Sequence, residues 1–324
     1  MNRFLYFLML GALLGTGPTL TQARTPYEET IDDSRSRGFR LFGGPSREGP
    51  EAQWEKVQGF VEADRLRPAI RHAGYLVNTW PDHPRAVEAQ RLIADLEFAR
   101  ENYERAFNAY QVLIDQYAGM FDYDAVLSQQ LICAEKVEKQ TSWALFGRYN
   151  NPLEAVPLYR QLITNAPHLD ITPELLFRIG EIQMSKRKFA EAIQEYDLLE
   201  QRYPRSEFSV QAAFRRAEAF AEISNRHPTD LGPARSALAA YRYFLEAYPD
   251  SDKAEKARKR VTEFRDYLAE RHFAMAKFYE KNMRQPEAAL AAYQALTQQF
   301  PDSAWTDKAK SRIQKLTPEA PSHE

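Results

Sequence analysis

The chain has 324 residues, of which 44% are hydrophobic and 27% are charged, and its formal net charge at pH 7 is −2. This balance excludes an intrinsically disordered chain, and it provides no broad basic field of the kind that binds nucleic acid. Only 13 glycines are present and strand-type runs are few, so we expect an all-α protein. From the charge balance we expect no nucleic-acid partner.

The first 23 residues have the pattern of an export signal. A positive start at Met1–Arg3 precedes an apolar core over Phe4–Gly15, and Thr21–Ala23 offers a small-x-small cleavage site. This pattern predicts a secretory signal peptide over residues 1–23, with an uncleaved membrane anchor as the alternative. Residues 15–40 contain no cysteine, so we expect a periplasmic protein that is not lipidated at its N-terminus.

The remainder divides into three segments by composition. Residues 24–50 mix arginine with glycine and proline, which predicts a flexible linker. Residues 51–316 carry the apolar helical patterns of the folded part, and residues 317–324 are expected to be a disordered tail.

Six apolar helical stretches in the folded part end on a repeated stop signal. Counted from the first, the stops follow one another at intervals of 37, 49, 37, 45 and 52 residues. Proline cannot continue a helix, so each stop marks the end of one helical hairpin. The spacing predicts a tetratricopeptide-type solenoid of about six hairpins. The stops are Trp80-Pro81, Tyr203-Pro204, Tyr248-Pro249 and Phe300-Pro301, with the variants Tyr117-Ala118 and Ala166-Pro167.

Small and aromatic residues recur in register inside these units. Gly180 and Ala192 are expected where two helices of a hairpin cross, and Tyr196 is expected to fill the space between successive hairpins. An acidic residue mostly follows the small residue of the first helix, as in Gly180-Glu181. The predicted structural positions are Ala69, Ala106, Ala155, Gly180, Ala192, Tyr196, Pro204, Ala237, Tyr241, Pro249, Ala276, Ala289, Tyr293 and Pro301.

Three of the five intervals between stops are longer than 37 residues, so these units must contain additional residues. Asn225–Pro233 and Gln140–Pro152 are rich in helix breakers, so we expect each to interrupt its hairpin at the turn. Ser251–Lys281 is almost free of glycine and proline, which predicts a lengthened helix instead. A last helix over Ala304–Leu316, capped by Ser303, is expected to close the end of the stack.

Signals of catalysis are weak. The six histidines show no metal-ligand spacing, and the chain has no glycine-rich phosphate loop, nucleophile elbow or CxxC motif. Cys133 is the only cysteine, and its position in a helix before Ala134 predicts a buried, inert thiol. We therefore expect no enzyme, no cofactor and no metal.

Several C-terminal segments resemble a known family. Leu268–Tyr279, Pro286–Ala289 and Phe300–Ser303 resemble the C-terminal repeats of the BamD family, the tetratricopeptide subunits of the outer-membrane β-barrel assembly machinery. Tyr203–Ser206 and Tyr248–Ser251 share an aromatic-Pro-x-Ser signature, which also resembles periplasmic coordinators of the Tol system.

The resemblance implies a non-catalytic adaptor at the periplasmic side of the outer membrane, with peripheral membrane contact possible. Its C-terminal repeats would hold partner subunits such as the barrel-assembly pore, and its N-terminal repeats would meet unfolded outer-membrane proteins. The alternatives are a Tol-Pal or cell-wall coordinator and, from another class, an envelope hydrolase or its subunit.

Two surfaces are candidates for binding. Aromatic residues three positions before the small residue could line a groove for an extended peptide, or could instead pack between hairpins. These groove candidates are Trp54, Phe177, Phe214 and Phe273, with Leu131 at the same register. A basic run could dock an acidic partner or lipid headgroups, or could be neutralised by Glu255 and Glu263. The run comprises Lys253, Lys256, Arg258, Lys259 and Arg260.

Overall fold

The computed structural model describes residues 48–144, 147–167 and 169–317. The predicted signal peptide, nearly all of the predicted linker and residues 318–324 of the predicted tail lie outside these ranges. The described chain divides into two compact units, and the division falls between Cys133 and Ala134, inside one helix.

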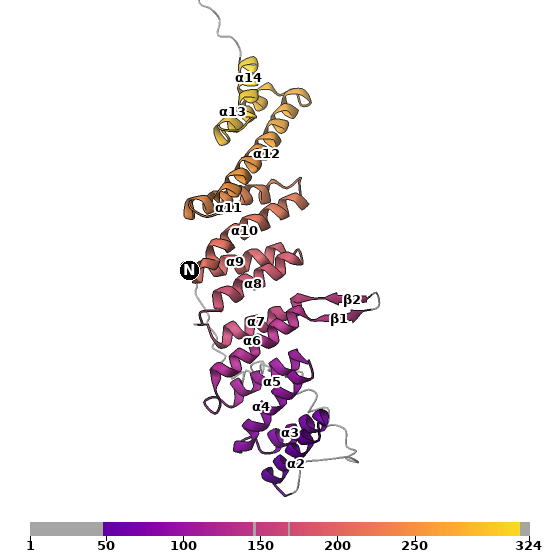
Figure 1. The fold of residues 1–324 in the computed structure, drawn as a ribbon. Coiled ribbons are helices and arrows are strands. Elements are labelled where there is room, and N and C mark those ends of the chain that lie inside the picture. The colour runs from indigo at the N-terminus through magenta and orange to yellow at the C-terminus, as the bar shows by residue number, and fades with distance from the viewer. Residues whose placement is uncertain (1–47, 145–146, 168, 318–324) are drawn as a thin grey trace, which may run out of the picture. The chain divides into compact units, whose positions relative to one another are not determined.

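The first unit is a series of antiparallel helices, each packed on the next in the chain (Figure 1). Neighbours α2 and α3, α3 and α4, and α4 and α5 make the contacts, as the short connections between them require. The helices are α2 (Pro50–Glu62), α3 (Leu66–Thr79), α4 (Pro84–Ala99), α5 (Tyr103–Gln116) and the first part of α6 (Tyr123–Lys139).

The second unit continues the same pattern from the end of α6. A two-stranded antiparallel hairpin follows α6, with Thr141 paired to Asn150 and Ala144 to Gly147. Its elements are β1 (Thr141–Ala144), β2 (Gly147–Asn150), the 3-10 helix η1 (Pro152–Ala155), α7 (Val156–Asn165), α8 (Thr172–Ser185), α9 (Phe189–Arg202), α10 (Glu207–Arg226), α11 (Leu231–Ala247), α12 (Ala254–Lys281), α13 (Pro286–Gln299) and α14 (Thr306–Leu316). Apart from the β-hairpin, the described residues form the all-α hairpin fold that the sequence predicts, which is confirmed.

The six predicted stops are the residues that end helices. Each stop residue is the C-cap of its helix, and its backbone N–H donates to the carbonyl four residues earlier, as Tyr203 donates to Leu199. The other five caps are Trp80, Tyr117, Ala166, Tyr248 and Phe300. The aromatic therefore closes one helix, and the following proline prevents it from continuing.

The serine of the aromatic-Pro-x-Ser signature starts the next turn. The hydroxyl oxygens of Ser206, Ser251 and Ser303 each accept the backbone N–H two residues later, at 3.2, 3.3 and 3.2 Å. In the first unit the Nδ1 atom of His83 takes the same role and accepts from Arg85 at 3.3 Å. The signature thus stops one helix and satisfies a free donor near the start of the next.

Of the three predicted insertions, the first lies at the turn of its hairpin as expected but contains two strands, and the second is shorter than expected. Within residues 140–152, Thr141–Ala144 and Gly147–Asn150 pair as the strands β1 and β2 between α6 and α7. In the second case the predicted loop is wrong, because α10 continues to Arg226 and only a short turn separates it from α11. Ala219 in the C-terminal half of α10 packs against Phe189 and Ile193 of α9, and this burial stabilises the longer helix. Pro233 lies in the first turn of α11, where its missing N–H costs no hydrogen bond.

The third insertion and the last helix agree with expectation. α12 has 28 residues, so its extra length is helical as predicted. The last helix begins at Thr306, two residues later than expected, and packs against α13. No helix within the described ranges is long and apolar enough to cross a membrane.

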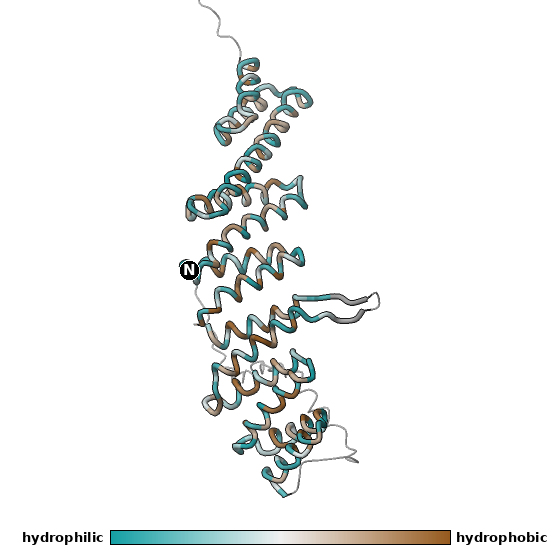
Figure 2. The backbone as a smooth tube through the Cα atoms, in the orientation of Figure 1, coloured by the Kyte–Doolittle hydropathy of each residue, from teal (hydrophilic) through white to brown (hydrophobic). Residues whose placement is uncertain are grey.

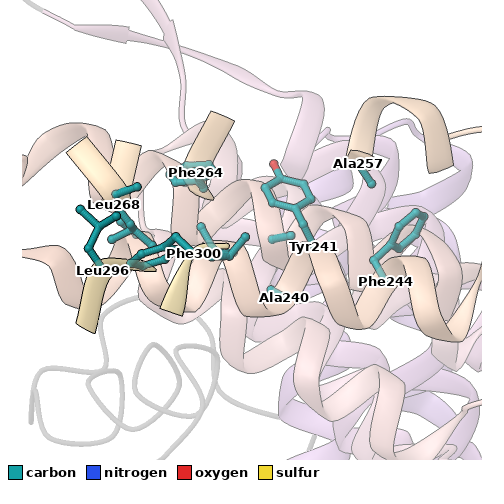
Figure 3. Packing of buried hydrophobic residues seen from close by; sticks show 14 of the residues in the cluster. Ala240, Tyr241, Phe244, Ala257, Phe264, Leu268, Leu296 and Phe300 are labelled. Carbon is teal, nitrogen blue, oxygen red and sulfur yellow. The ribbon is translucent and has the colours of Figure 1, made fainter. Parts of the chain in front are cut away.

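The core of the second unit lies between its C-terminal helices. Tyr241 and Phe244 of α11 lie beside Phe264 and Leu268 of α12, and Leu296 and Phe300 extend the cluster toward α13 (Figure 3). The Tyr241 and Phe264 rings are stacked with centroids 6.2 Å apart. Figure 2 shows apolar and polar residues alternating along the helices, the pattern of helices that bury one face.

Candidate functional site

Fully buried tyrosines mark the second helix of five hairpins. Four of them donate the phenolic hydroxyl to a carboxylate of the preceding helix. The pairs are Tyr110 with Asp95 at 2.5 Å, Tyr159 with Glu138 at 2.6 Å, Tyr196 with Glu181 at 2.6 Å and Tyr293 with Glu280 at 3.0 Å. Asp95 and Glu181 are acids that follow the small residue in the sequence. Burial and then the hydrogen bond to Glu181 raise the pKa of Tyr196, so the hydroxyl stays protonated.

Arginines from the following hairpin complete these contacts in the second unit. Arg215 of α10 donates to both oxygens of Glu181 on α8, at 2.6 and 2.7 Å, and to Glu218 at 2.8 Å. Burial lowers the pKa of Arg215, but the hydrogen bonds to Glu181 and Glu218 outweigh it and the pKa is raised. Arg178 on α8 donates one hydrogen bond to Glu135 and one to Glu138 of α6, and Arg312 of α14 donates to Glu280 of α12.

These tyrosine, carboxylate and arginine groups therefore form a polar junction between neighbouring hairpins. A bidentate arginine on a half-buried carboxylate fixes the angle between two helices more firmly than an exposed pair would. Because the charges satisfy one another, the junctions stabilise the stack and are not free anion-binding sites.

The candidate groove residues divide between core and half-buried positions. Phe214 is 2% exposed, with its ring centroid 5.8 Å from Tyr241 and 5.2 Å from Phe244. Phe214 is therefore core, and the expectation that its ring faces a peptide groove is wrong. The cause is the partner helix α11, whose Tyr241 and Phe244 rings cover the Phe214 ring, with Lys253 and Lys256 lying over it as well.

The rings of the other three aromatic candidates are partly exposed to solvent. Phe177 lies 5.9 Å from Tyr196 and 5.8 Å from Phe208, so it packs between α8, α9 and α10. Phe273 lies 5.3 Å from Tyr293 and 5.2 Å from Trp305. Trp54 in the first unit is half-buried, and the guanidinium of Arg85 is 5.8 Å from its ring. Leu131 on α6 is also half-buried.

The predicted structural positions lie in two environments. The small and aromatic members are buried: Ala69, Ala106, Ala155, Gly180, Ala192, Tyr196, Ala237, Tyr241, Ala276, Ala289 and Tyr293. The prolines are exposed just after the helix ends, at Pro204, Pro249 and Pro301. Their role is to end helices, since they contribute little to the core.

The basic run on α12 is largely neutralised by nearby acids. Lys256 pairs with Glu218 at 2.8 Å, Arg258 with Glu255 at 3.3 Å and Arg260 with Glu263 at 2.5 Å. The ammonium groups of Lys253 and Lys256 also lie over the Phe214 ring, at 5.4 and 5.0 Å. Most of the run therefore stabilises the face between α10 and α12.

The environment of Cys133 and the arrangement of the described acidic residues give no indication of a nucleophile or a metal site. Cys133 is fully buried, and burial together with the charge of Asp95 raises its pKa to about 12. A thiol in this environment is a poor nucleophile. Among the residues that the structure describes, no group of three or more His, Cys, Asp or Glu could hold a metal ion.

One surface feature was missed by sequence reasoning. Met275, Phe278 and Met283, at and just after the end of α12, are 45%, 50% and 50% exposed. The helical spacing of Met275 and Phe278 can be recognised in the sequence. Their exposure depends on how far the neighbouring helix extends, which only the tertiary structure shows.

Two family models match separate parts of the chain. The tetratricopeptide repeat model matches residues 56–121 and 146–207, and the YfiO model, described as an outer membrane lipoprotein, matches residues 214–290. The chain is therefore similar to tetratricopeptide-repeat proteins over the first two ranges and to the YfiO family over the third, which we call the YfiO-family segment. This YfiO-family segment begins in α10 and ends in α13, so it includes the buried Phe214 and the whole of α12.

A curated relative agrees with this assignment. The outer membrane protein assembly factor BamD of Caulobacter vibrioides is 26% identical over 167 residues, which cover 52% of this chain and 53% of the relative. The chain thus matches about half the length of that relative. The family description is of a lipoprotein. The expectation of an unlipidated N-terminus concerns residues outside the described ranges and stays a prediction.

Solved tetratricopeptide-repeat structures are similar at low identity. The C-terminal part of a repeat protein from Cytophaga hutchinsonii is 15% identical, with a TM-score of 0.31, covering 88% of this chain and 92% of that one. YrrB, described as having an unusual peptide-binding site, is 13% identical with a TM-score of 0.29, covering 72% of this chain and 98% of that one.

Proposed function

We propose that this protein is a non-catalytic periplasmic scaffold in outer-membrane β-barrel assembly. The observation that carries the proposal is the YfiO match over residues 214–290, together with the relative named as a BamD assembly factor. Helical hairpins that stack by nearest-neighbour contacts present extended surfaces for other chains, which is the usual task of such arrays.

The chemistry of the described residues supports binding rather than catalysis. The charged groups at the hairpin junctions are paired, as Glu181 is by Tyr196 and Arg215, so none is poised to attack or to transfer a proton. The thiol of Cys133 is buried and protonated at neutral pH. A scaffold needs no reactive group, whereas a hydrolase requires a nucleophile or an activated water.

We infer two classes of protein partner. One is the pore subunit of the assembly machinery, held by the YfiO-family segment. The other is the unfolded outer-membrane protein, whose alternating aromatic strands would contact the half-buried rings of Phe177 and Phe273 in the second unit, with Trp54 as a separate candidate in the first. An aromatic ring with one face exposed suits this task, because it adds contact area at a low cost in conformational entropy.

Affinity purification of the tagged full-length chain from cross-linked, detergent-solubilised envelopes tests the role. We expect recovery of a barrel-assembly pore subunit together with outer-membrane proteins in transit. Recovery of peptidoglycan-associated proteins without the pore subunit would overturn the proposal and favour a Tol-Pal or cell-wall coordinator. A Gly180→Trp variant, in which the α8–α9 hairpin cannot close, is the control for capture by the misfolded chain.

A further inference from the structure

α12 is much longer than the helix on which it packs. It has 28 residues against 17 in α11, a difference that corresponds to about 16 Å of helix. The Tyr267 hydroxyl donates to the carbonyl of Pro228 at 2.8 Å, which places the middle of α12 level with the turn before α11. The C-terminal turns of α12 therefore continue beyond the α10–α11 hairpin (Figure 1).

This overhang exposes an apolar face that is buried earlier in the same helix. Phe264 and Leu268 are 6% and 1% exposed, because they pack against α11 and the rest of the core. Met275 lies seven residues after Leu268, about two turns further on the same face, and Phe278 lies one turn beyond it. Their exposures are 45% and 50%, since α11 no longer covers them.

The turn that follows α12 adds to the exposed apolar surface. Met283 is 50% exposed in the connection to α13, and Arg284 next to it has a φ of 52°. The backbone reverses direction at this point, so the three apolar side chains lie at the end of a helical hairpin. We call Met275, Phe278, Met283 and the cations around them the α12 tip.

The α12 tip carries an excess of exposed positive charge. Residues 271–286 contain four cations and a single acid, Glu280, which is occupied by Tyr293 and Arg312. Within the described part of the chain, Lys277, Lys281 and Arg284 have no acidic partner within 4 Å. The fourth cation, Arg271, lies over the Tyr267 ring at 5.2 Å. The acids Glu270 and Glu287 flank the segment.

We propose that the α12 tip contacts an anionic phospholipid surface, with Phe278 and the two methionines entering the headgroup region and the cations binding lipid phosphates. Apolar side chains at a helix end can enter a bilayer interface without a partner that matches their shape. Lysine and arginine beside them gain from the negative surface potential, by about fivefold in affinity for each cation. The basic run earlier in α12 lacks this property, because acids pair with most of its charges.

A single-cysteine label tests the contact in the full-length chain. Cys133 is buried, so a Met283→Cys variant can be labelled at the tip with an environment-sensitive bimane. The matched control is Tyr243→Cys, at a site 45% exposed in the same unit. We expect vesicles of phosphatidylglycerol and phosphatidylcholine to shift the emission of the tip label to the blue, and not that of the control. Vesicles of phosphatidylcholine alone should act far more weakly.

Two further substitutions separate the charge from the apolar contribution. Lys281→Gln should weaken the response about fivefold and reduce its dependence on salt. Phe278→Ser should weaken it about tenfold or more at every lipid composition. No shift with anionic vesicles would overturn the proposal, and so would an equal shift at both label sites. A tip label that responds only to a purified barrel-assembly pore subunit would overturn it as well, and would mark the tip as a protein interface. The readout is local, so failure leaves the scaffold proposal untouched.

Discussion

The ring of Tyr196 in α9 crosses α8 directly over Gly180, and a Cβ atom at position 180 would lie 2.4 Å from the Cε1 atom of that ring. Two further ring atoms would lie at 2.8 and 2.9 Å. The ring cannot easily move, because it is fully buried and its hydroxyl is bonded to Glu181. Only glycine permits this crossing distance between the two helices.

Gly180→Ala should therefore destabilise the chain by about 1–3 kcal/mol, the usual cost of overpacking. The intrinsic helix propensity of alanine opposes this effect by only about 1 kcal/mol. The control is Gly59→Ala in α2, where an added Cβ meets nothing within 4 Å. That variant should be stabilised by about 0.5–1 kcal/mol. Urea denaturation followed by circular dichroism measures both, and equal effects at the two sites would contradict the crossing geometry.

Arg215 and Lys256 both pair with Glu218, but they differ in burial. The Arg215 side chain is 30% exposed and also holds Glu181, whereas that of Lys256 is 62% exposed. Arg215→Met should cost about 2–3 kcal/mol, because it leaves the Glu181 carboxylate half-buried with only its tyrosine partner. Lys256→Met should cost less than about 1 kcal/mol. Measuring the free energy of unfolding of the two variants tests this difference. A larger loss of stability for Lys256→Met than for Arg215→Met would refute the junction role of Arg215.

The hairpin repeat could be predicted because its signals are local. A C-cap aromatic, a following proline and a serine that accepts a backbone N–H all act within a few residues, as at Tyr203, Pro204 and Ser206. The extension of α10 to Arg226 could not be predicted from Pro228 and Gly232 alone. It depends on the burial of Ala219 against Phe189, a contact between residues 30 positions apart.

The exposure of the candidate groove residues was harder to predict, because it too depends on contacts between residues far apart in the sequence. Phe177 and Phe214 occupy the same register in their helices, yet one is half-buried and the other is core. The difference arises from the partner helix α11, since its Tyr241 and Phe244 rings both pack against Phe214. Met275 and Phe278 show the reverse case, in which an apolar face is left exposed because the neighbouring helix ends earlier.

Stability should depend on pH through His72 in the first unit. Burial, then the charges of Lys56 and Arg71, lower its pKa from 6.5 to about 4. The side-chain amide of Gln53 donates to the carbonyl of His72 at 2.7 Å and lies 3.2 Å from its Nδ1, which suits a neutral ring. Between pH 6.5 and about pH 4 the unfolded chain binds a proton at His72 and the folded chain does not. The contribution of His72 to stability is therefore complete above pH 6.5 and is lost as the pH falls to about 4.

Between pH 7 and pH 4.5 this one group should remove about 2 kcal/mol of stability. His72→Gln should abolish that part of the pH dependence, whereas the exposed control His227→Gln should retain it. Urea midpoints at the two pH values give the comparison, and parallel pH profiles for His72→Gln and the wild type would contradict the assignment.

Cys133 should react only when α6 opens. Its thiol is fully buried and its pKa is raised to about 12, so both access and thiolate fraction are low at neutral pH. Iodoacetamide should therefore modify the native chain at a small fraction of the rate seen in urea, as followed by intact mass. The free model thiol N-acetylcysteine is the reference, and a native rate within about tenfold of it would show that the site is accessible.

The proposed peptide contact at Phe177 can be separated from packing by comparison with Phe214. Phe214→Ala should cost about 3–5 kcal/mol, as for a fully buried ring. Phe177→Ala should cost less, about 1–2 kcal/mol, because part of its ring is exposed. At a temperature where both variants remain folded, Phe177→Ala should weaken binding of a labelled β-barrel strand peptide about tenfold, and Phe214→Ala should change it little.

Fluorescence anisotropy provides the affinities, and Tyr243→Ala is the control for the loss of a half-exposed ring away from α8. If Phe177 contributes only to packing against Tyr196 and Phe208, its removal will lower stability and leave the peptide affinity equal to that of the control. That outcome would assign Phe177, like Phe214, to the core. The unfolded outer-membrane protein would then have to bind elsewhere on the hairpins.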